Sequence, residues 1–199
     1  MDLIPMPLPP GQLAEIEAAH MQPPRAYHNV GHVQALLRHH RDVAAGPGWR
    51  QPREVALAML YHDAIYEAGR GDNEARSATL AREAIARWLP DAGVDAERVA
   101  ALIELTARHG RLRADELDSD AALFLDSDMA ILGAPPAVFD VYDRGIAEEY
   151  RGKVPGFLFR LNRRRFLKGV LAQPRIFFSD FFHGRYDAQA RENLRRVTE

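Results

Sequence analysis

The sequence predicts an all-α protein, and three observations support that prediction. Apolar residues recur with a period of about 3.6, clearest in the stretch between residues 33 and 43. Runs of alternating β-branched residues, which would indicate strands, are absent from the chain. Prolines and glycines separate the periodic segments from one another. We therefore expect a helical bundle of roughly eight or nine helices.

The first half of the chain is predicted to hold five helices after a Pro-rich, extended segment over residues 1–10. Asn29 is a plausible N-cap for the second helix. The third is almost continuously apolar from Val55 to Tyr61, which is typical of a buried central helix. The predicted helices are Gly11–His20, Asn29 to the break at Ala45, Pro52–Tyr66, Asn73–Leu89 and Asp95–His109.

The second half begins with a polar stretch over residues 112–120, followed by the apolar run Ala121–Leu125. Paired phenylalanines near residue 180 are expected to be core residues. No long linker divides the chain, so we predict one domain over 1–199, with an extension at 1–24, a metal-site core at 25–135 and C-terminal helices at 136–199. The predicted later helices are Pro136–Tyr150, Pro155–Leu171, Ile176–Phe182 and Ala188–Val197.

Composition narrows the class of protein. The 199 residues carry 26 basic and 28 acidic side chains, a net charge of −2, so binding to nucleic acid is not expected. The chain has no cysteine, which excludes disulfides and thiolate metal sites. No apolar run approaches the roughly 20 residues that span a bilayer, and no signal peptide is recognisable. We expect a cytoplasmic protein that does not enter a membrane; homo-oligomerisation is left open.

Four residues within or beside apolar helical segments could bind a divalent cation: His32, His62, Asp63 and Asp128. A carboxylate at the end of a buried helix has to be paired or to bind a metal, and the helix dipole disfavours it at that end. A bound cation would answer both objections for Asp63; a buried salt bridge to an arginine is the alternative. Two histidines and two carboxylates suit Mn, Fe, Zn, Co or Ni, and Mg less well.

This order of residues, His…His-Asp…Asp on helices, resembles the HD superfamily of metal-dependent phosphohydrolases, and the match covers most of the chain. It is similar in particular to a bacterial group of predicted metal-dependent HD phosphohydrolases. The matching motifs are Tyr27-His28-Asn29-x-x-His32, Tyr61-His62-Asp63-x-x-Tyr66-Glu67, Asn73-Glu74-x-x-Ser77-Ala78, Thr106-x-x-His109 and Phe124-Leu125-Asp126-Ser127-Asp128-Met129-Ala130-Ile131-Leu132-Gly133. The resemblance implies an HD-domain helical bundle with a central metal site.

The opening motif also resembles that of the cyclic-nucleotide phosphodiesterases. That resemblance implies that His32 binds the metal and that His28 donates a proton to the leaving oxygen. The chain departs from those enzymes after Asp63, where they carry a further Asp-His pair. Asp126 competes with Asp128 for the last ligand position, and the family pattern favours Asp128. Asp126 would then lie behind the ligands, or would hold a histidine ring in orientation.

Several further residues are candidates for supporting roles. Glu67 shares a face with Asp63 if the helix continues, and could orient the attacking water; the alternative is a solvated helix end. Glu74 opens the next predicted helix, where its negative charge is expected to interact favourably with the positive end of the helix dipole. His109 could bind a second metal or be structural. A phosphate-bearing substrate could be held by Arg25, Lys153, Arg160 and Arg164.

These observations predict a metal-dependent phosphohydrolase that cleaves a phosphoester or phosphoanhydride of a nucleotide or similar small phosphorylated metabolite. His28, Asp63 and Glu67 are the predicted catalytic residues. Two alternatives remain open. One is an HD-type diiron oxygenase, which would need additional ligands such as His109. The other is an HD module that senses a nucleotide without turning it over.

Overall fold

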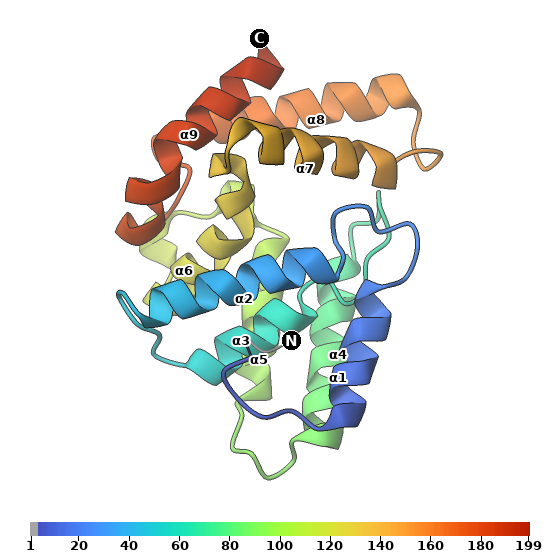
Figure 1. Ribbon diagram of the computed structural model, residues 1–199, viewed down its shortest axis with the longest axis vertical. Coiled ribbons are helices and arrows are strands. Elements are labelled where there is room, and N and C mark those ends of the chain that lie inside the picture. The colour runs from blue at the N-terminus through green and yellow to red at the C-terminus, as the bar shows by residue number, and fades with distance from the viewer. Residues whose placement is uncertain (1–3) are drawn as a thin grey trace. The chain divides into compact units, whose positions relative to one another are not determined.

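The computed structural model describes residues 4–199 and confirms the all-α prediction for that range (Figure 1). The first three residues of the predicted extended segment lie outside it. The chain divides into two compact units, up to His109 and from Gly110 onward, and each is described by itself. The single domain over 1–199 stays a prediction. The α-helices are α1 (Pro10–His20), α2 (Val30–Ala44), α3 (Pro52–Tyr61), α4 (Asn73–Trp88), α5 (Ala96–Thr106), α6 (Ser119–Met129), α7 (Pro136–Glu149), α8 (Gly156–Leu171) and α9 (Asp180–Thr198).

Helix α3 is the buried centre of the first unit and packs against α2, α4 and α5. Every residue from Val55 to Leu60 is completely buried, as its uniformly apolar sequence predicts. The helix ends at Tyr61, so the predicted continuation to Tyr66 is wrong. Beyond it, backbone groups of residues 63–67 are bound by side chains from other segments instead of by a helical ladder.

Side-chain caps set the beginnings of two helices in this unit. The Asn29 carboxamide oxygen accepts a hydrogen bond from the Gly31 N–H at 2.8 Å, which confirms it as the N-cap of α2. Asp95 caps α5 in the same way through the Arg98 N–H. Helix α5 ends at Thr106, three residues before the predicted end, and His109 begins the short 3-10 helix η1 (His109–Arg111).

In the second unit, α9 packs against α6, α8 and the 3-10 helix η3 (Ala130–Gly133), and α7 also contacts η3. Residues Ala188–Val197 are helical as predicted, but the predicted separate helix at Ile176–Phe182 is wrong, because one helix runs from Asp180 to Thr198. Its N-cap is Ser179, whose hydroxyl accepts a hydrogen bond from the Phe182 N–H, and no proline interrupts it. Phe177 and Phe182 are fully buried, which confirms that they are core residues.

Glycine is required where η3 approaches α9. A Cβ atom on Gly133 would lie 2.6 Å from the backbone oxygen of Tyr186, too close for any other residue without movement.

In residues 4–199, no single helix is long and apolar enough to cross a membrane. One pair of helices, bent by 105°, meets the length and composition criteria jointly: Ser119–Gly133 with Pro136–Glu149.

Candidate metal centre

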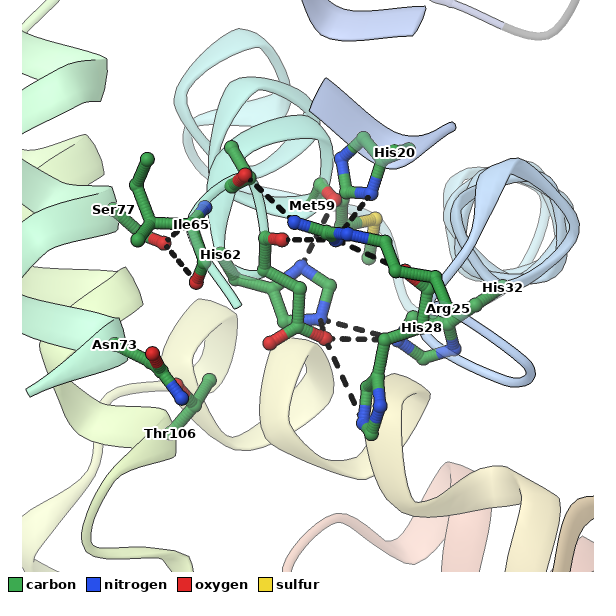
Figure 2. A network of polar contacts seen from close by, with 12 residues as sticks. His20, Arg25, His28, His32, Met59, His62, Ile65, Asn73, Ser77 and Thr106 are labelled. Carbon is green, nitrogen blue, oxygen red and sulfur yellow. Dashed lines mark hydrogen bonds and ion pairs between the residues drawn. The ribbon is translucent and has the colours of Figure 1, made fainter. Parts of the chain in front are cut away.

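Three of the four predicted metal ligands converge in the first unit. His62 Nε2 lies 3.1 Å from His32 Nε2 and 3.0 Å from Asp63 Oδ2. The third edge, from His32 Nε2 to Asp63 Oδ2, measures 3.6 Å. Figure 2 shows the His32 and His62 rings directed toward this one point from different segments of the chain. The predicted convergence of His32, His62 and Asp63 is therefore found in the structure.

The spacing of these three atoms fits a bound divalent cation. Metal–nitrogen and metal–oxygen bonds of about 2.0–2.2 Å place neighbouring ligands roughly 3.0–3.6 Å apart, which matches the three edges of the cluster. Two imidazole lone pairs facing each other repel unless a proton or a cation lies between them. A proton would bridge only one pair of these atoms, whereas a cation would be bound by all three at once. The cluster could therefore hold a metal ion.

The two histidines are fixed by the ends of two helices. His32 lies in the first turn of α2, just after the Asn29 cap. His62 follows the last residue of α3, and its Nδ1 lies 3.0 Å from the carbonyl oxygen of Met59. A hydrogen on Nδ1 makes that hydrogen bond, which leaves the Nε2 lone pair directed at the cluster. This is the tautomer that a metal-binding imidazole requires.

Asp63 lies in the turn after α3, with its carboxylate facing imidazoles. Burial acts to raise the pKa of the carboxyl group, but the neighbouring His62, His28 and His32 rings outweigh it and lower that pKa. The predicted alternative was a salt bridge to an arginine. The basic side chains within 4.0 Å of the Asp63 carboxylate are instead these three histidines, and Arg25 binds the backbone carbonyl of Asp63.

His28 lies at the edge of the cluster. Its Nε2 is 4.0 Å from Asp63 Oδ2, beyond hydrogen-bonding distance, and its side chain is 18% exposed against 3% for His32. The ring packs on Tyr66, with centroids 4.1 Å apart and planes tilted by 31°. His28 is therefore placed next to the three-atom cluster, on its more open side.

Arg25, predicted to bind phosphate, makes structural contacts with the backbone (Figure 2). Its Nη1 donates to the carbonyl oxygens of His28 at 3.0 Å and Asp63 at 2.6 Å, and its Nη2 donates to that of Ala64 at 2.9 Å. His20, to which the sequence assigned no role, supports this group from α1. Its Nε2 lies 2.9 Å from the Leu60 carbonyl oxygen and its Nδ1 3.5 Å from Arg25 Nη1. Burial lowers the pKa of His20 to about 4 and keeps the ring neutral.

Two side chains of the Asn73-x-x-x-Ser77 motif hold the rest of the segment after Asp63. The Ser77 hydroxyl accepts a hydrogen bond from the Ile65 N–H at 3.0 Å and donates one to the Ile65 carbonyl at 3.2 Å. Asn73 pairs with both the N–H and the carbonyl of Glu67, at 3.1 and 3.0 Å. The motif thus acts on the backbone next to the candidate ligands, a role that its sequence alone does not reveal.

The proposed face shared by Glu67 and Asp63 does not exist, because α3 ends before either residue. The Glu67 carboxylate is half exposed and pairs with Arg76 at 2.8 Å and Arg70 at 3.6 Å. The hydrogen bond from Arg76 lowers the pKa of Glu67, which weakens it as a base. Glu74 lies in the first turn of α4, as predicted. A second metal bound by His109 stays a prediction.

The remaining predicted site residues belong to the second unit. Asp126 is fully buried, and its carboxylate accepts hydrogen bonds from the N–H groups of Phe178 and Ser179 and from the Ser179 hydroxyl, at 2.6–2.7 Å. It holds the start of α9, not a histidine ring as predicted. Burial raises its pKa to about 6, against the opposing effect of these hydrogen bonds. Asp128 lies one residue before the end of α6, and its role as a ligand stays a prediction.

The basic residues predicted to bind substrate lie on or near α8. Lys153 and Arg160 are exposed. Arg164 donates to the carbonyl oxygens of Thr198 and Glu199, at 2.9 and 3.2 Å, and so binds the end of α9. Phosphate binding by these three residues stays a prediction.

Comparison with known proteins adds no relative: no family model, no curated protein and no solved structure matches this chain. Function is therefore inferred from the sequence motifs and from the geometry of the three-atom cluster.

Proposed function

We propose that this protein is a metal-dependent phosphohydrolase of the HD type that acts on a nucleotide or a similar small phosphorylated metabolite. The observation that carries the proposal is the convergence of His32 Nε2, His62 Nε2 and Asp63 Oδ2 within 3.0–3.6 Å. These atoms come from the two motifs that resemble the HD superfamily. The resemblance supplies the reaction class, and the geometry supplies a place for the ion.

The metal ligands in this proposal are His32, His62 and Asp63, all of the first unit. Asp128 as a fourth ligand stays a prediction from the sequence. Asp126 is the weaker candidate because both of its carboxylate oxygens already accept hydrogen bonds. A divalent ion bound there would lower the pKa of water toward neutrality and polarise a phosphoryl oxygen. Mn, Fe, Zn, Co or Ni suits two imidazoles and carboxylates better than Mg does.

The protein's own groups would then handle the proton and the orientation of substrate. A water oxygen forms a bond to phosphorus while that water releases one proton to solvent, and the bond from phosphorus to the leaving oxygen breaks. His28 donates a proton to that leaving oxygen, for which its place on the open side of the cluster is suitable. Neutralisation of phosphate charge by Lys153 and Arg160 stays a prediction from the sequence.

The test is a panel of mono-, di- and cyclic nucleotides assayed for phosphate or nucleoside release with Mn²⁺ or Co²⁺ added. We expect turnover of at least one of them, and the Asp63→Ala variant should lose both bound metal and activity. Asp72→Ala is the matched control, because Asp72 lies on the surface of the same unit and pairs with Arg70; it should keep both properties.

Two results would contradict the proposal in different ways. Tight binding of one nucleotide without turnover of any would indicate a sensor module. Two irons per chain with a visible absorption band, in protein purified without added metal, would indicate an oxygenase.

A further inference from the structure

Residues 63–67 carry one candidate ligand, and side chains from elsewhere bind their backbone. Arg25 binds the carbonyls of Asp63 and Ala64, and Ser77 binds both polar groups of Ile65. Because these residues lie outside helices and strands, their part-buried backbone groups need such partners. The orientation of the Asp63 carboxylate therefore depends on side chains that do not themselves reach the cluster.

We propose that Arg25 is a positioning residue for the metal centre and not a phosphate-binding residue. This proposal rests on the metal site of the proposed function, but it does not depend on which reaction that site performs. One guanidinium joins the carbonyl of His28, in the opening motif, to the carbonyl of Asp63, in the second motif. The Arg25 guanidinium thereby fixes the distance between His28, the candidate proton donor, and Asp63, the candidate ligand. Ser77 assists by binding the backbone of Ile65.

The donors of Arg25 are directed inward by its surroundings. Nη1 donates hydrogen bonds to two carbonyl oxygens and lies 3.5 Å from His20 Nδ1, while Nη2 donates one to the carbonyl oxygen of Ala64. The guanidinium carbon also lies 5.7 Å from the centre of the Tyr66 ring, the same ring on which His28 packs. A planar group with several fixed donors can bridge three carbonyls, which a lysine ammonium on a flexible stem cannot reproduce.

The experiment compares Arg25→Lys with Arg53→Lys by titrating metal-free protein with Co²⁺ alone, using calorimetry and the visible absorption of the bound ion. Arg53 is the matched control. Its guanidinium also bridges two backbone carbonyls in the same unit, those of Ala92 and Gly93 at 2.9 and 3.0 Å, away from the cluster. We expect Arg25→Lys to weaken Co²⁺ binding about 10- to 100-fold, as loss of an orienting contact does. Arg53→Lys should leave Co²⁺ affinity within about twofold of the unaltered protein, whatever stability it loses.

Ser77→Ala is the second variant, for use if Arg25→Lys does not fold. It removes only the hydroxyl that holds Ile65 and should also weaken Co²⁺ binding without abolishing it. Unchanged Co²⁺ affinity in Arg25→Lys, or in Ser77→Ala where Arg25→Lys does not fold, would overturn the positioning role. Unchanged Co²⁺ affinity in Arg25→Lys together with weaker binding of inorganic phosphate to the Co²⁺-loaded protein would restore Arg25 as a phosphate ligand.

The result separates this inference from the proposed function. If Arg25→Lys weakens Co²⁺ binding but no phosphorylated compound is turned over, the positioning role stands and the phosphohydrolase proposal fails. If the unaltered protein binds no Co²⁺, the metal centre itself is wrong and the positioning role is wrong with it.

Discussion

Two histidines four residues apart occupy different environments in this protein. His32 is almost fully buried, and its Nε2 lies 3.1 Å from the corresponding atom of His62. His28 is more exposed, packs on Tyr66 and reaches no closer than 4.0 Å to the Asp63 carboxylate. The two environments differ, and the division into a metal ligand and a proton donor that the opening motif implied stays a prediction.

This asymmetry predicts different outcomes for the two alanine substitutions. His28→Ala should keep its metal and lose activity by about 10² to 10⁴-fold, the usual contribution of a general acid. His32→Ala should lose the metal, because it removes one of three converging ligand atoms. Metal content by elemental analysis and turnover of the best substrate from the nucleotide panel are the two measurements. Loss of metal from His28→Ala would show that the roles are divided incorrectly.

At the scale of elements, the sequence predicted the helices better than their ends. Periodicity located α2, α4 and α8 to within two residues, because an amphipathic stripe is a local property of the chain. The end of α3 was missed because Ser77 and Asn73 bind the backbone that follows it. Those partners come from a segment that becomes a neighbour only when the chain folds.

The candidate site could likewise be predicted only in part. His32, His62 and Asp63 could be predicted because their residue types and order carry the chemistry. The contacts of Arg25 and His20 could not, since both act on backbone carbonyls and a carbonyl has no signature in the sequence. A basic residue next to a histidine motif was read as a phosphate ligand, whereas the structure directs it to the protein's own backbone.

The contacts of Asp126 with the start of α9 allow a test of which carboxylate in the motif Phe124–Gly133, Asp126 or Asp128, binds the metal. Asp126 accepts three hydrogen bonds at the start of α9, so Asp126→Asn should destabilise the protein by about 1–3 kcal/mol. It should leave Co²⁺ affinity unchanged, while Asp128→Asn should weaken that affinity. Urea unfolding and Co²⁺ titration of both variants are the measurements. The reverse pattern would make Asp126 the ligand.

At the scale of the whole molecule, buried polar groups link stability to pH. The unfolded chain protonates His20 near its ordinary pKa of 6.5, whereas in the folded protein burial lowers that pKa to about 4. Between these values the unfolded state binds more protons. The contribution of His20 is therefore fully present above about pH 6.5 and is lost as the pH falls toward 4.

We predict that His20 alone costs the first unit about 2 kcal/mol of stability between pH 7 and pH 5. His20→Gln keeps a donor for the Leu60 carbonyl but does not titrate. The free energy of unfolding of this variant should therefore fall by about 2 kcal/mol less over the same pH interval. Both tryptophans, Trp49 and Trp88, lie in the first unit, and their fluorescence during urea unfolding of metal-free protein reports on that unit. The other histidines are present in both proteins, so the difference between the two pH profiles reports on His20 and its contacts. Parallel profiles would show that the buried ring does not govern the acid sensitivity of this unit.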